Sequence, residues 1–438
     1  MRYNLNDQPA TSELISYSLQ HLTFFLANAA ILPVIVGSYL GLDQSAIAGL
    51  VQRTFILCGI ASFLQCKWGH GFPIFEGPAG MWYGIFITLA TTAPALGKPL
   101  SVLRTDIELG LIIAGLCCII LGLTGLVGKT IRLFSPLVNG IFLCLMSLQL
   151  SPTMIKGFLG ITAVNQLLDG KCLLASFVTT ALIIWISLTK KGFWQSIAIL
   201  LGAGVGWLVA TLLGLSPSIH QDTALLLPEV FPWGFPTFDA GVVLTCVLAA
   251  IIVFSNLVAS ILGLCNLTGE PPKAKLFNRG AAFTGIADVL AGICSIIGFI
   301  PYASAVGYTA MTGVAARKPF YLGAALLTLL GVFPPVSAFF AALPPTVGYS
   351  VMFVVYTMIL GLGIKEFAKT PLTNRELFII GISLLIGIGV MFLPQQVFND
   401  VPVAFRYLLL NGLVDGVLIC ILLEQVLLRQ RGSEKQTI

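Results

Sequence analysis

Long runs of apolar residues, separated by short polar stretches, follow one another along the whole chain. A run of about 20 apolar residues has the length of a helix that crosses a bilayer, so the pattern predicts an all-α polytopic membrane protein. Fourteen transmembrane segments are expected, at 14–37, 45–65, 78–93, 106–126, 131–150, 172–188, 194–214, 240–264, 279–298, 304–316, 319–341, 346–364, 374–393 and 403–428. The third and the tenth are too short to cross the bilayer core alone.

Two segments break this pattern at membrane depth. Residues 72–84, "FPIFEGPAGMWYG", hold two prolines, three glycines and a carboxylate, and residues 299–308, "FIPYASAVGY", again join aromatics and a proline to a small-residue helix start. Irregular backbone at this depth must be satisfied by protein. We therefore expect Phe72–Phe75 and Phe299–Tyr302 to pair as short strands.

The spacing of these breaks predicts an internal repeat. Pro73 and Pro301 lie 228 residues apart, and Gln20-His21-Leu22 is echoed by Ser255-Asn256-Leu257, 235 residues later. Seven predicted helices separate the members of each pair, and an odd number inverts the second half. Interrupted segments at matching positions of inverted halves indicate a transporter's midplane site, so we expect a 7+7 inverted repeat.

A helix that begins at mid-membrane has backbone N–H groups without intrahelical partners. Those groups can donate to an oxygen of a ligand, assisted by the positive end of the helix dipole. The small residues around Gly77, Pro78, Ala79 and Gly80 allow a ligand to approach the backbone. The alternative interpretation is a re-entrant loop that binds nothing.

Composition agrees with a membrane protein. Hydrophobic residues make up 57% of the chain and charged residues 9%, with a mean hydropathy of +0.98, whereas soluble domains carry about 25% charged residues. The polar start, "MRYNLNDQPATSE", lacks a cleavable signal pattern. We expect the first apolar run to be retained as a span.

The loop charges predict the orientation. With a cytoplasmic N-terminus, 17 of the 23 Lys and Arg residues fall on the cytoplasmic side, five outside, and Arg53 within a span. This asymmetry is the one that the positive-inside rule expects, so both termini are predicted to be cytoplasmic in a multi-pass protein of the cell (inner or plasma) membrane. The net charge of +5 then faces anionic membrane lipid and requires no nucleic-acid partner.

The sequence shows no pattern typical of a catalytic site or a metal site. The ten Cys residues form no CxxC pair, and the three His residues, His21, His70 and His220, are far apart in the predicted layout. An enzyme needs a nucleophile–base set or a metal cluster, and an ungated channel would show repeated pore rings. We expect neither, and no cofactor or metal.

Four motifs resemble the nucleobase–ascorbate transporter family, also called the second nucleobase:cation symporter family. "SLQHL" at 18–22 resembles the family's Gln-His motif, and "EGPAGMWYG" at 76–84 resembles its broken third helix. "FSNLVASILG" at 254–263 and "YASAVGYTAMTG" at 302–313 stand where the family has its helix-eight segment and helix-ten signature. The likeness in layout covers essentially the whole chain.

The last two motifs depart from the pattern. Family members have a carboxylate where this chain has Ser255, and Glu or Gln followed by Asn where it has Ser304-Ala305. The chain is most similar to a divergent bacterial branch of purine and uracil/xanthine permeases.

The resemblance implies a core domain moving against a gate domain, often in a homodimer. The core would comprise residues 1–126 and 240–341, and the gate residues 127–239 and 342–438. The implied substrate is a purine or pyrimidine base such as uracil or xanthine, often coupled to a proton or another cation. Carried over, Gln20 and His21 line the site, Gly80 presents its N–H to the base, and Ala303 and Ser304 lie at the helix-ten break.

Further binding candidates come from the residues themselves. Ser255, Asn256 and Ser304 offer donors and acceptors that suit a nucleobase edge, and Tyr302, Trp82, Phe254 and Tyr308 could stack on its ring. The alternative for each aromatic is a core or lipid contact. The expected substrate-binding residues are Gln20, His21, Gly80, Met81, Trp82, Ser255, Asn256, Tyr302, Ala303 and Ser304.

Three groups are candidates for proton coupling. Glu76 precedes the third helix, whose N-terminus stabilises its charge. Asp288 lies mid-span, where an ionisable residue indicates function, although it could instead pair with Arg53 or another core group. His21 is the third candidate. The alternatives to a proton-coupled permease are a passive nucleobase facilitator and a sulfate- or bicarbonate-like anion carrier of the same fold.

Overall fold

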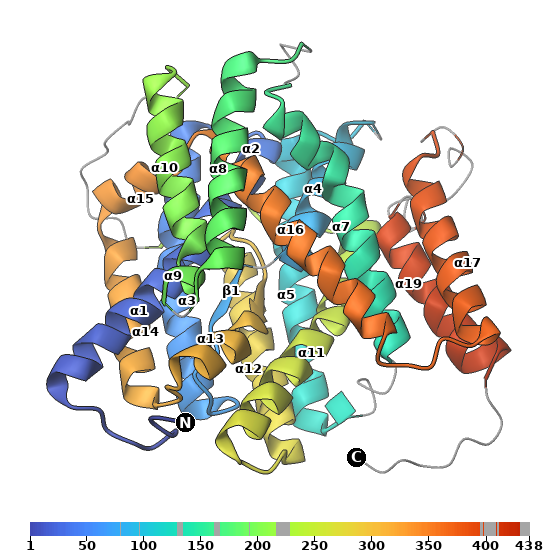
Figure 1. Cartoon of the computed structure of the whole chain (residues 1–438). Helices are drawn as coiled ribbons and strands as arrows, with labels where there is room; N and C mark the ends of the chain where they lie inside the picture. The colour runs from blue at the N-terminus through green and yellow to red at the C-terminus, as the bar shows by residue number, and fades with distance from the viewer. Residues whose placement is uncertain are drawn as a thin grey trace.

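The structure is a computed structural model of the chain. It describes residues 1–78, 80–95, 97–128, 135–161, 167–191, 193–215, 228–394, 397, 409 and 411–429. Helices dominate, and the described residues contain one two-stranded sheet (Figure 1).

The elements are described in two stretches of the chain, each of which contains one strand. The first runs α1 (Thr11–Ala29), α2 (Ile31–Tyr39), α3 (Gln44–Trp68), β1 (Glu76–Pro78), α4 (Gly80–Ala95), α5 (Leu100–Thr124), α7 (Pro136–Phe158), α8 (Gly170–Thr189), α9 (Phe193–Ser196) and α10 (Ala198–Leu212). The second runs α11 (Ala240–Thr268), α12 (Ala274–Ile293), β2 (Phe299–Pro301), α13 (Ser304–Thr312), α14 (Arg317–Val332), α15 (Pro334–Ala341), α16 (Pro345–Phe367), α17 (Asn374–Met391), α19 (Gly412–Leu422) and η2 (Leu423–Leu427).

Each of the fourteen predicted segments contains a helix, but fewer helices pass a strict test for spanning. Among the described residues, eight are long and apolar enough to cross a membrane, or nine if the bent pair α14 and α15 forms one span. The eight are α1 with α2, α3, α5, α7, α8, α11, α16 and α17. A mostly helical membrane-type fold is therefore confirmed, while fourteen crossings and the 7+7 repeat stay predictions.

Three predicted helices are divided in the structure. The segment 14–37 forms α1 and α2, and 194–214 forms α9 and α10. The segment 319–341 bends by 85° between α14 and α15. Pro334 and Pro335 explain this bend, because proline cannot donate the backbone hydrogen bond that would continue α14.

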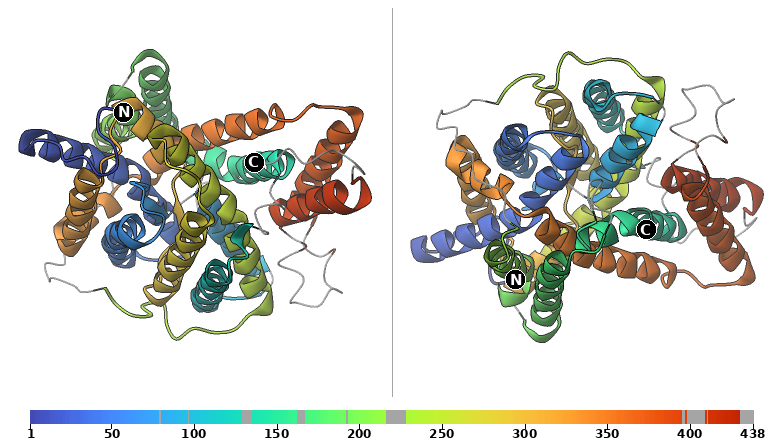
Figure 2. Two further views of the ribbon diagram at one scale, coloured as in Figure 1. Left: turned by 90° about the horizontal axis from the view of Figure 1, so that it is seen from below. Right: turned by 90° about the horizontal axis from the view of Figure 1, so that it is seen from above.

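Close helix packing relies on glycine. A Cβ added at Gly115 of α5 would come 2.5 Å from the Gly285 carbonyl oxygen of α12, and one added at Gly285 would come 2.5 Å from that of Gly115. Small residues allow helix backbones to approach closely in membrane proteins. Viewed end-on, α17 and α19 lie at one edge of the molecule and α1 at the opposite edge (Figure 2).

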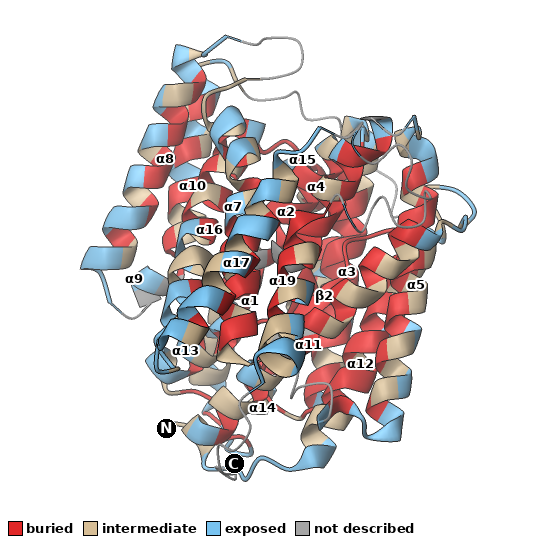
Figure 3. Cartoon of the chain, turned by 90° about the vertical axis from the view of Figure 1, so that its right-hand side faces the viewer, coloured by how far each residue is buried: buried red, intermediate tan, exposed pale blue. Residues whose placement is uncertain are grey.

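The outer faces of the helices are apolar. Exposed residues on α8 include Phe177, Trp185 and Leu188, and buried residues gather on the inward faces (Figure 3). Large exposed apolar side chains around a helical bundle are typical of a surface that contacts lipid.

Candidate functional site: two broken segments joined by a sheet

The two interrupted segments meet at the centre of the molecule. Strands β1 and β2 pair antiparallel, with Glu76 opposite Pro301, Gly77 opposite Ile300 and Pro78 opposite Phe299. The predicted pairing is confirmed, but β1 comprises residues 76–78 rather than 72–75, and Pro78 lies in the strand rather than in the first turn of α4.

The register explains why the strands tolerate two prolines. Tyr302 N–H donates to the Phe75 carbonyl at 2.9 Å, so these residues form a hydrogen-bonded pair. Hydrogen-bonded and non-hydrogen-bonded pairs alternate along an antiparallel ladder. Pro301 and Pro78 therefore occupy non-hydrogen-bonded positions, where the missing N–H costs no ladder bond.

Five backbone groups that point away from the ladder have side-chain partners on neighbouring elements. Ser62 of α3 accepts from Glu76 N–H at 3.0 Å and donates to the Glu76 carbonyl at 3.3 Å. On the other strand, Asp288 Oδ1 accepts from Phe299 N–H at 2.7 Å, and Trp82 Nε1 donates to the Phe299 carbonyl at 3.2 Å. Tyr302 OH donates to the Pro78 carbonyl. The irregular backbone is thus satisfied by protein, as membrane depth requires.

Glu76 is fully buried in a polar network. Gln65 Nε2 of α3 lies 2.9 Å from each of three acceptors: Glu76 Oε1, the Gly280 carbonyl oxygen and Thr284 Oγ1. Thr284 Oγ1 also donates to Glu76 Oε1, at 3.2 Å. Glu76 Oε2 is buried and has no hydrogen-bond partner among the described residues.

One face of α12 holds both strands. Thr284 and Asp288 are four residues apart and so lie one above the other on the helix; the first contacts Glu76 of β1 and the second contacts Phe299 of β2. Asp288 is fully buried, and its Oδ2 has no partner among the described residues. Arg53 donates to the Cys294 carbonyl at 2.8 Å and forms no ion pair with Asp288 among the described residues. The partner of Asp288 is the Phe299 N–H, so of the alternative pairing with Arg53 or another core group the second form is observed.

Helices α4 and α13 both begin next to the sheet. Ala79 lies outside the described residues, and Gly80 and Met81 belong to α4 but their burial is not described. Trp82 is fully buried.

On α13, the N-terminal residue Ser304 is exposed and its N-cap, Ala303, is partly buried. Gly307, one turn later, is exposed too, and a Cβ added there would have nothing within 4 Å. Residues three apart share a helix face, so one face of α13 is open.

Helix α1 brings His21 but not Gln20 toward the sheet. His21 is buried, with its ring 5.0 Å from that of Tyr308 and 5.4 Å from that of Phe320. Phe25 stacks on Phe75 at 4.1 Å, which links α1 to the residue before β1. Gln20 does not contact these aromatic rings. Its Nε2 donates to Ser16 Oγ, and it lines a hollow with Tyr17 and Met311.

Helix α11 packs against α13 beside the break, where a Cβ added at Gly263 would come 2.7 Å from Val306. Phe254 is fully buried and Asn256 is partly buried, while the side chain of Ser255 lies outside the described residues. The structure therefore gathers Glu76, Asp288, Trp82 and Tyr302 at the sheet, with His21 beyond Phe25, and leaves the contribution of Ser255 a prediction.

Sequence reasoning missed Ser62, Gln65 and Thr284. All three are buried polar residues in apolar helices. Asp288 was a candidate because a polar group at membrane depth is costly and therefore indicates function. The same argument applies to Gln65 and could have identified that residue.

Comparisons with known proteins agree with this layout. The profile of a family described as "Permease family" matches residues 12–396. A Bacillus subtilis protein named "Putative purine permease YwdJ" is 33% identical over 430 residues, covering 96% of this chain and 98% of that protein. "Uric acid permease PucK" of the same organism is 27% identical over 426 residues, covering 96% of each.

A solved structure shares the fold. The transmembrane domain of a cyanobacterium bicarbonate transporter, BicA, superposes with a TM-score of 0.64 at 16% identity, covering 95% of this chain and 100% of that chain. The chain belongs to the permease family that the sequence motifs indicated, the nucleobase–ascorbate transporters, and is a multi-pass membrane permease rather than an enzyme.

Proposed function

We propose that this protein is a secondary active transporter of a nucleobase, with an oxidised purine such as urate or xanthine as the first candidate and uracil as the next. The observation that carries the proposal is the end-to-end similarity to permeases named for purines and uric acid. The paired strands support a location for the site, because they place two helix starts from opposite halves of the chain at one point.

The substrate would lie between the starts of α4 and α13. In this proposal the open face of α13 at Ser304 receives one edge of the base, and the first N–H groups of α4, at Gly80 and Met81, face another. His21, Ser255 and Asn256 complete the surroundings. Trp82 and Tyr302 direct their polar atoms at strand carbonyls, which favours them as residues that position the break.

Movement would follow the elevator-like or rocking scheme that the family resemblance implies. Residues 1–126 and 240–341 form the proposed core, and 127–239 and 342–438 the proposed gate. Closely packed helix pairs within each group, such as α5 with α12 and α7 with α16, support this division. Fourteen crossings, cytoplasmic termini, a location in the cytoplasmic membrane and a homodimer belong to the same proposal.

Proton coupling would use a buried carboxylate. Glu76 is the first candidate because it lies within a strand next to the proposed substrate and has one unpartnered oxygen. Asp288 is the second, since it too keeps one free oxygen. A passive facilitator has the same architecture without this step.

An anion carrier is the second candidate function. The fold likeness to a bicarbonate transporter favours it. Against it, residues 299–313 around the second break contain no Lys or Arg that would bind a small anion.

Uptake of labelled urate, xanthine, hypoxanthine and uracil, with bicarbonate and sulfate in parallel, tests the proposal in cells without their own base permeases. We expect concentrative uptake of at least one base that a protonophore abolishes. Uptake that survives the protonophore identifies a facilitator or another coupling ion. No uptake of any base by protein shown to be in the membrane overturns the proposal.

A further inference from the structure

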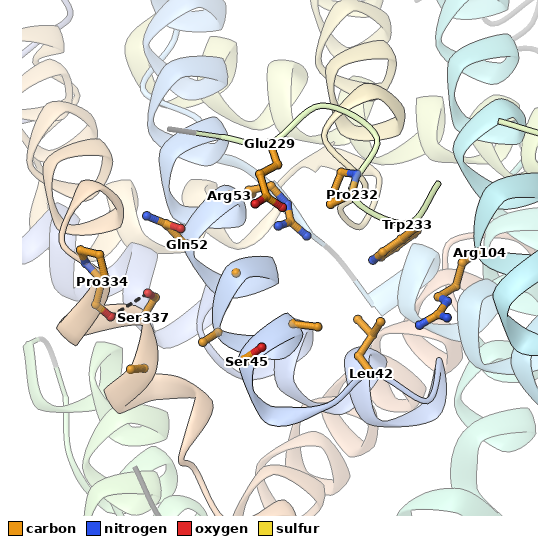
Figure 4. Close-up of a pocket in the computed structure, with 14 residues that line it drawn as sticks. Leu42, Ser45, Gln52, Arg53, Arg104, Glu229, Pro232, Trp233, Pro334 and Ser337 are labelled. Atoms are coloured by element: carbon orange, nitrogen blue, oxygen red, sulfur yellow. Dashed lines mark hydrogen bonds between the residues drawn. The ribbon is translucent and has the colours of Figure 1, made fainter. Parts of the chain in front are cut away.

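We propose a second base-binding site, specific for the anionic form of an oxidised purine, in a cavity at the start of α3 (Figure 4). The inference rests on the proposed function and extends it. The site would capture the base at one face of the protein, before the base reaches the sheet.

The cavity has a volume of about 420 Å³. Its walls come from the first turns of α3, the start of α5, residues 229–233 and α15. Arg53 precedes Gln65 by 12 residues on α3, which corresponds to about 18 Å along the helix axis. The chain just after the other end of α3 lies beside the N-terminal residues, since Arg317 donates to both the Gly71 carbonyl and Asn6 Oδ1, so the cavity belongs to the opposite half of the molecule.

Donors without partners surround the cavity. Arg104 Nε and Trp233 Nε1 are buried and donate to no protein acceptor among the described residues. Both side chains face the hollow from different elements (Figure 4). Buried donors normally have an acceptor, so a bound group with oxygen atoms would satisfy both.

Two guanidinium groups, which can bind an anion, face the cavity; the carboxylates nearest to them are Glu229, beside Arg53, and Glu108, close to both arginines. Arg53 uses Nε for the Cys294 carbonyl, which leaves its terminal N–H groups near the hollow, and Arg104 faces it across the cavity (Figure 4). Guanidinium groups bind oxyanions through charge-assisted hydrogen bonds.

The remaining walls suit a purine in particular. Glu229 stands beside Arg53 and supplies an acceptor for a ring N–H (Figure 4). The indole of Trp233 offers a flat surface on which a base can stack. Donors, an acceptor and an aromatic face together match an oxidised purine anion better than a spherical inorganic anion.

Residues 229–233 belong to the proposed gate by their place in the chain, but backbone hydrogen bonds fasten this wall of the cavity to helices of the proposed core. Phe231 N–H donates to the Ile293 carbonyl at 2.8 Å, one residue before the carbonyl that Arg53 uses. Thr237 N–H donates to the Thr105 carbonyl at 3.3 Å, next to Arg104. Residues 229–237 are thus fixed to α5 and α12, and the site would move with them.

The experiment compares urate, which is anionic at neutral pH, with neutral hypoxanthine in uptake and in equilibrium binding to the purified full-length protein. Arg104→Gln should raise the KM for urate about tenfold, the effect of losing one charge-assisted hydrogen bond, and leave the KM for hypoxanthine within twofold. Trp233→Leu removes the stacking surface and should likewise raise the KM for urate while leaving that for hypoxanthine within twofold, because the neutral base does not use the anion-specific site. Bound urate should fall from two per chain to one in either variant.

Controls remove a cation and an indole elsewhere: Lys190→Gln directly after α8 and Trp185→Leu on the exposed face of α8. Ala48→Phe fills the cavity without removing a charge and should also abolish the second bound urate. One urate per wild-type chain, or an unchanged urate KM in Arg104→Gln and Ala48→Phe, overturns the second site. Failure of the wild type to carry any base overturns the proposed function instead.

Discussion

The breaks at β1 and β2 have the same backbone plan but obtain their polar support differently. Each strand ends in a proline at a non-hydrogen-bonded position, and each is followed by a helix. β1 carries its own carboxylate, Glu76, which neighbouring helices contact through Gln65 and Thr284. β2 has no charged residue, and its Phe299 N–H donates to Asp288 of α12.

This difference separates two roles for buried carboxylates. Glu76 makes its side-chain contacts to neutral side chains, so its protonation state can change without removing a partner from the backbone. Asp288 satisfies a buried backbone N–H, which is costly to leave unpaired. On this comparison we propose coupling for Glu76 and positioning for Asp288.

The largest expected effect follows from neutralising each carboxylate. Glu76→Gln keeps an oxygen for Gln65 and Thr284 but cannot titrate, so proton-driven uptake should fall by about 5–150-fold, the range of a coupling free energy of about 1–3 kcal/mol. Asp288→Asn still accepts from Phe299 N–H and should keep protonophore-sensitive uptake. Initial rates with and without a protonophore measure both, and the reverse outcome would exchange the two roles.

The next effect concerns the residue before β2. A Cβ added at Gly298 would come 2.5–2.7 Å from the ring of Trp82, so Gly298→Ala should destabilise the protein by about 1–3 kcal/mol through overpacking. Gly307→Ala, at an open position on α13, should stabilise the helix by about 0.5–1 kcal/mol. Thermal unfolding of the detergent-solubilised variants should therefore shift in opposite directions; a shared direction would contradict the packing at β2.

The two breaks could be predicted from the sequence because the residues that cause them lie within the broken segments themselves. Pro73, Gly77 and Pro301 interrupt apolar runs, and helices cannot absorb such residues without a change in the backbone. The pairing of the two segments followed from the need to satisfy backbone at membrane depth. The exact strand did not, because Ser62, which holds Glu76, comes from another helix.

Contacts made by other helices were beyond the sequence. Thr284 follows Gln65 by 219 residues, and nothing local to either residue indicates the other. Sequence reasoning also grouped Gln20 with His21, whereas consecutive helical residues project about 100° apart, and only His21 faces the aromatic cluster. The cavity at Arg53 is formed by four separate elements and left no pattern in the chain.

A smaller effect is expected from the side chain that joins the two breaks. Trp82 belongs to the helix after β1 and donates to the Phe299 carbonyl of β2. Trp82→Phe removes this bond at a cost of about 1 kcal/mol and should lower uptake about fivefold by loosening β2. Trp185→Phe, 53% exposed on α8, serves as the control. Equal uptake by the two variants would show that the breaks are positioned independently.

The smallest effects are expected at the proposed substrate contacts. Ser304→Ala and Ser255→Ala each remove one neutral hydrogen bond to the base, worth about 0.5–1.5 kcal/mol, so the KM should rise about two- to tenfold with no change in unfolding temperature. Ser101→Ala is a matched control, since Ser101 is also an exposed serine in the first turn of a helix, but one without a break. A concentration series of uptake gives the KM. If both variants transport like the Ser101→Ala control, the base does not lie at the start of α13 or beside α11, and the open face at Ser304 has another purpose.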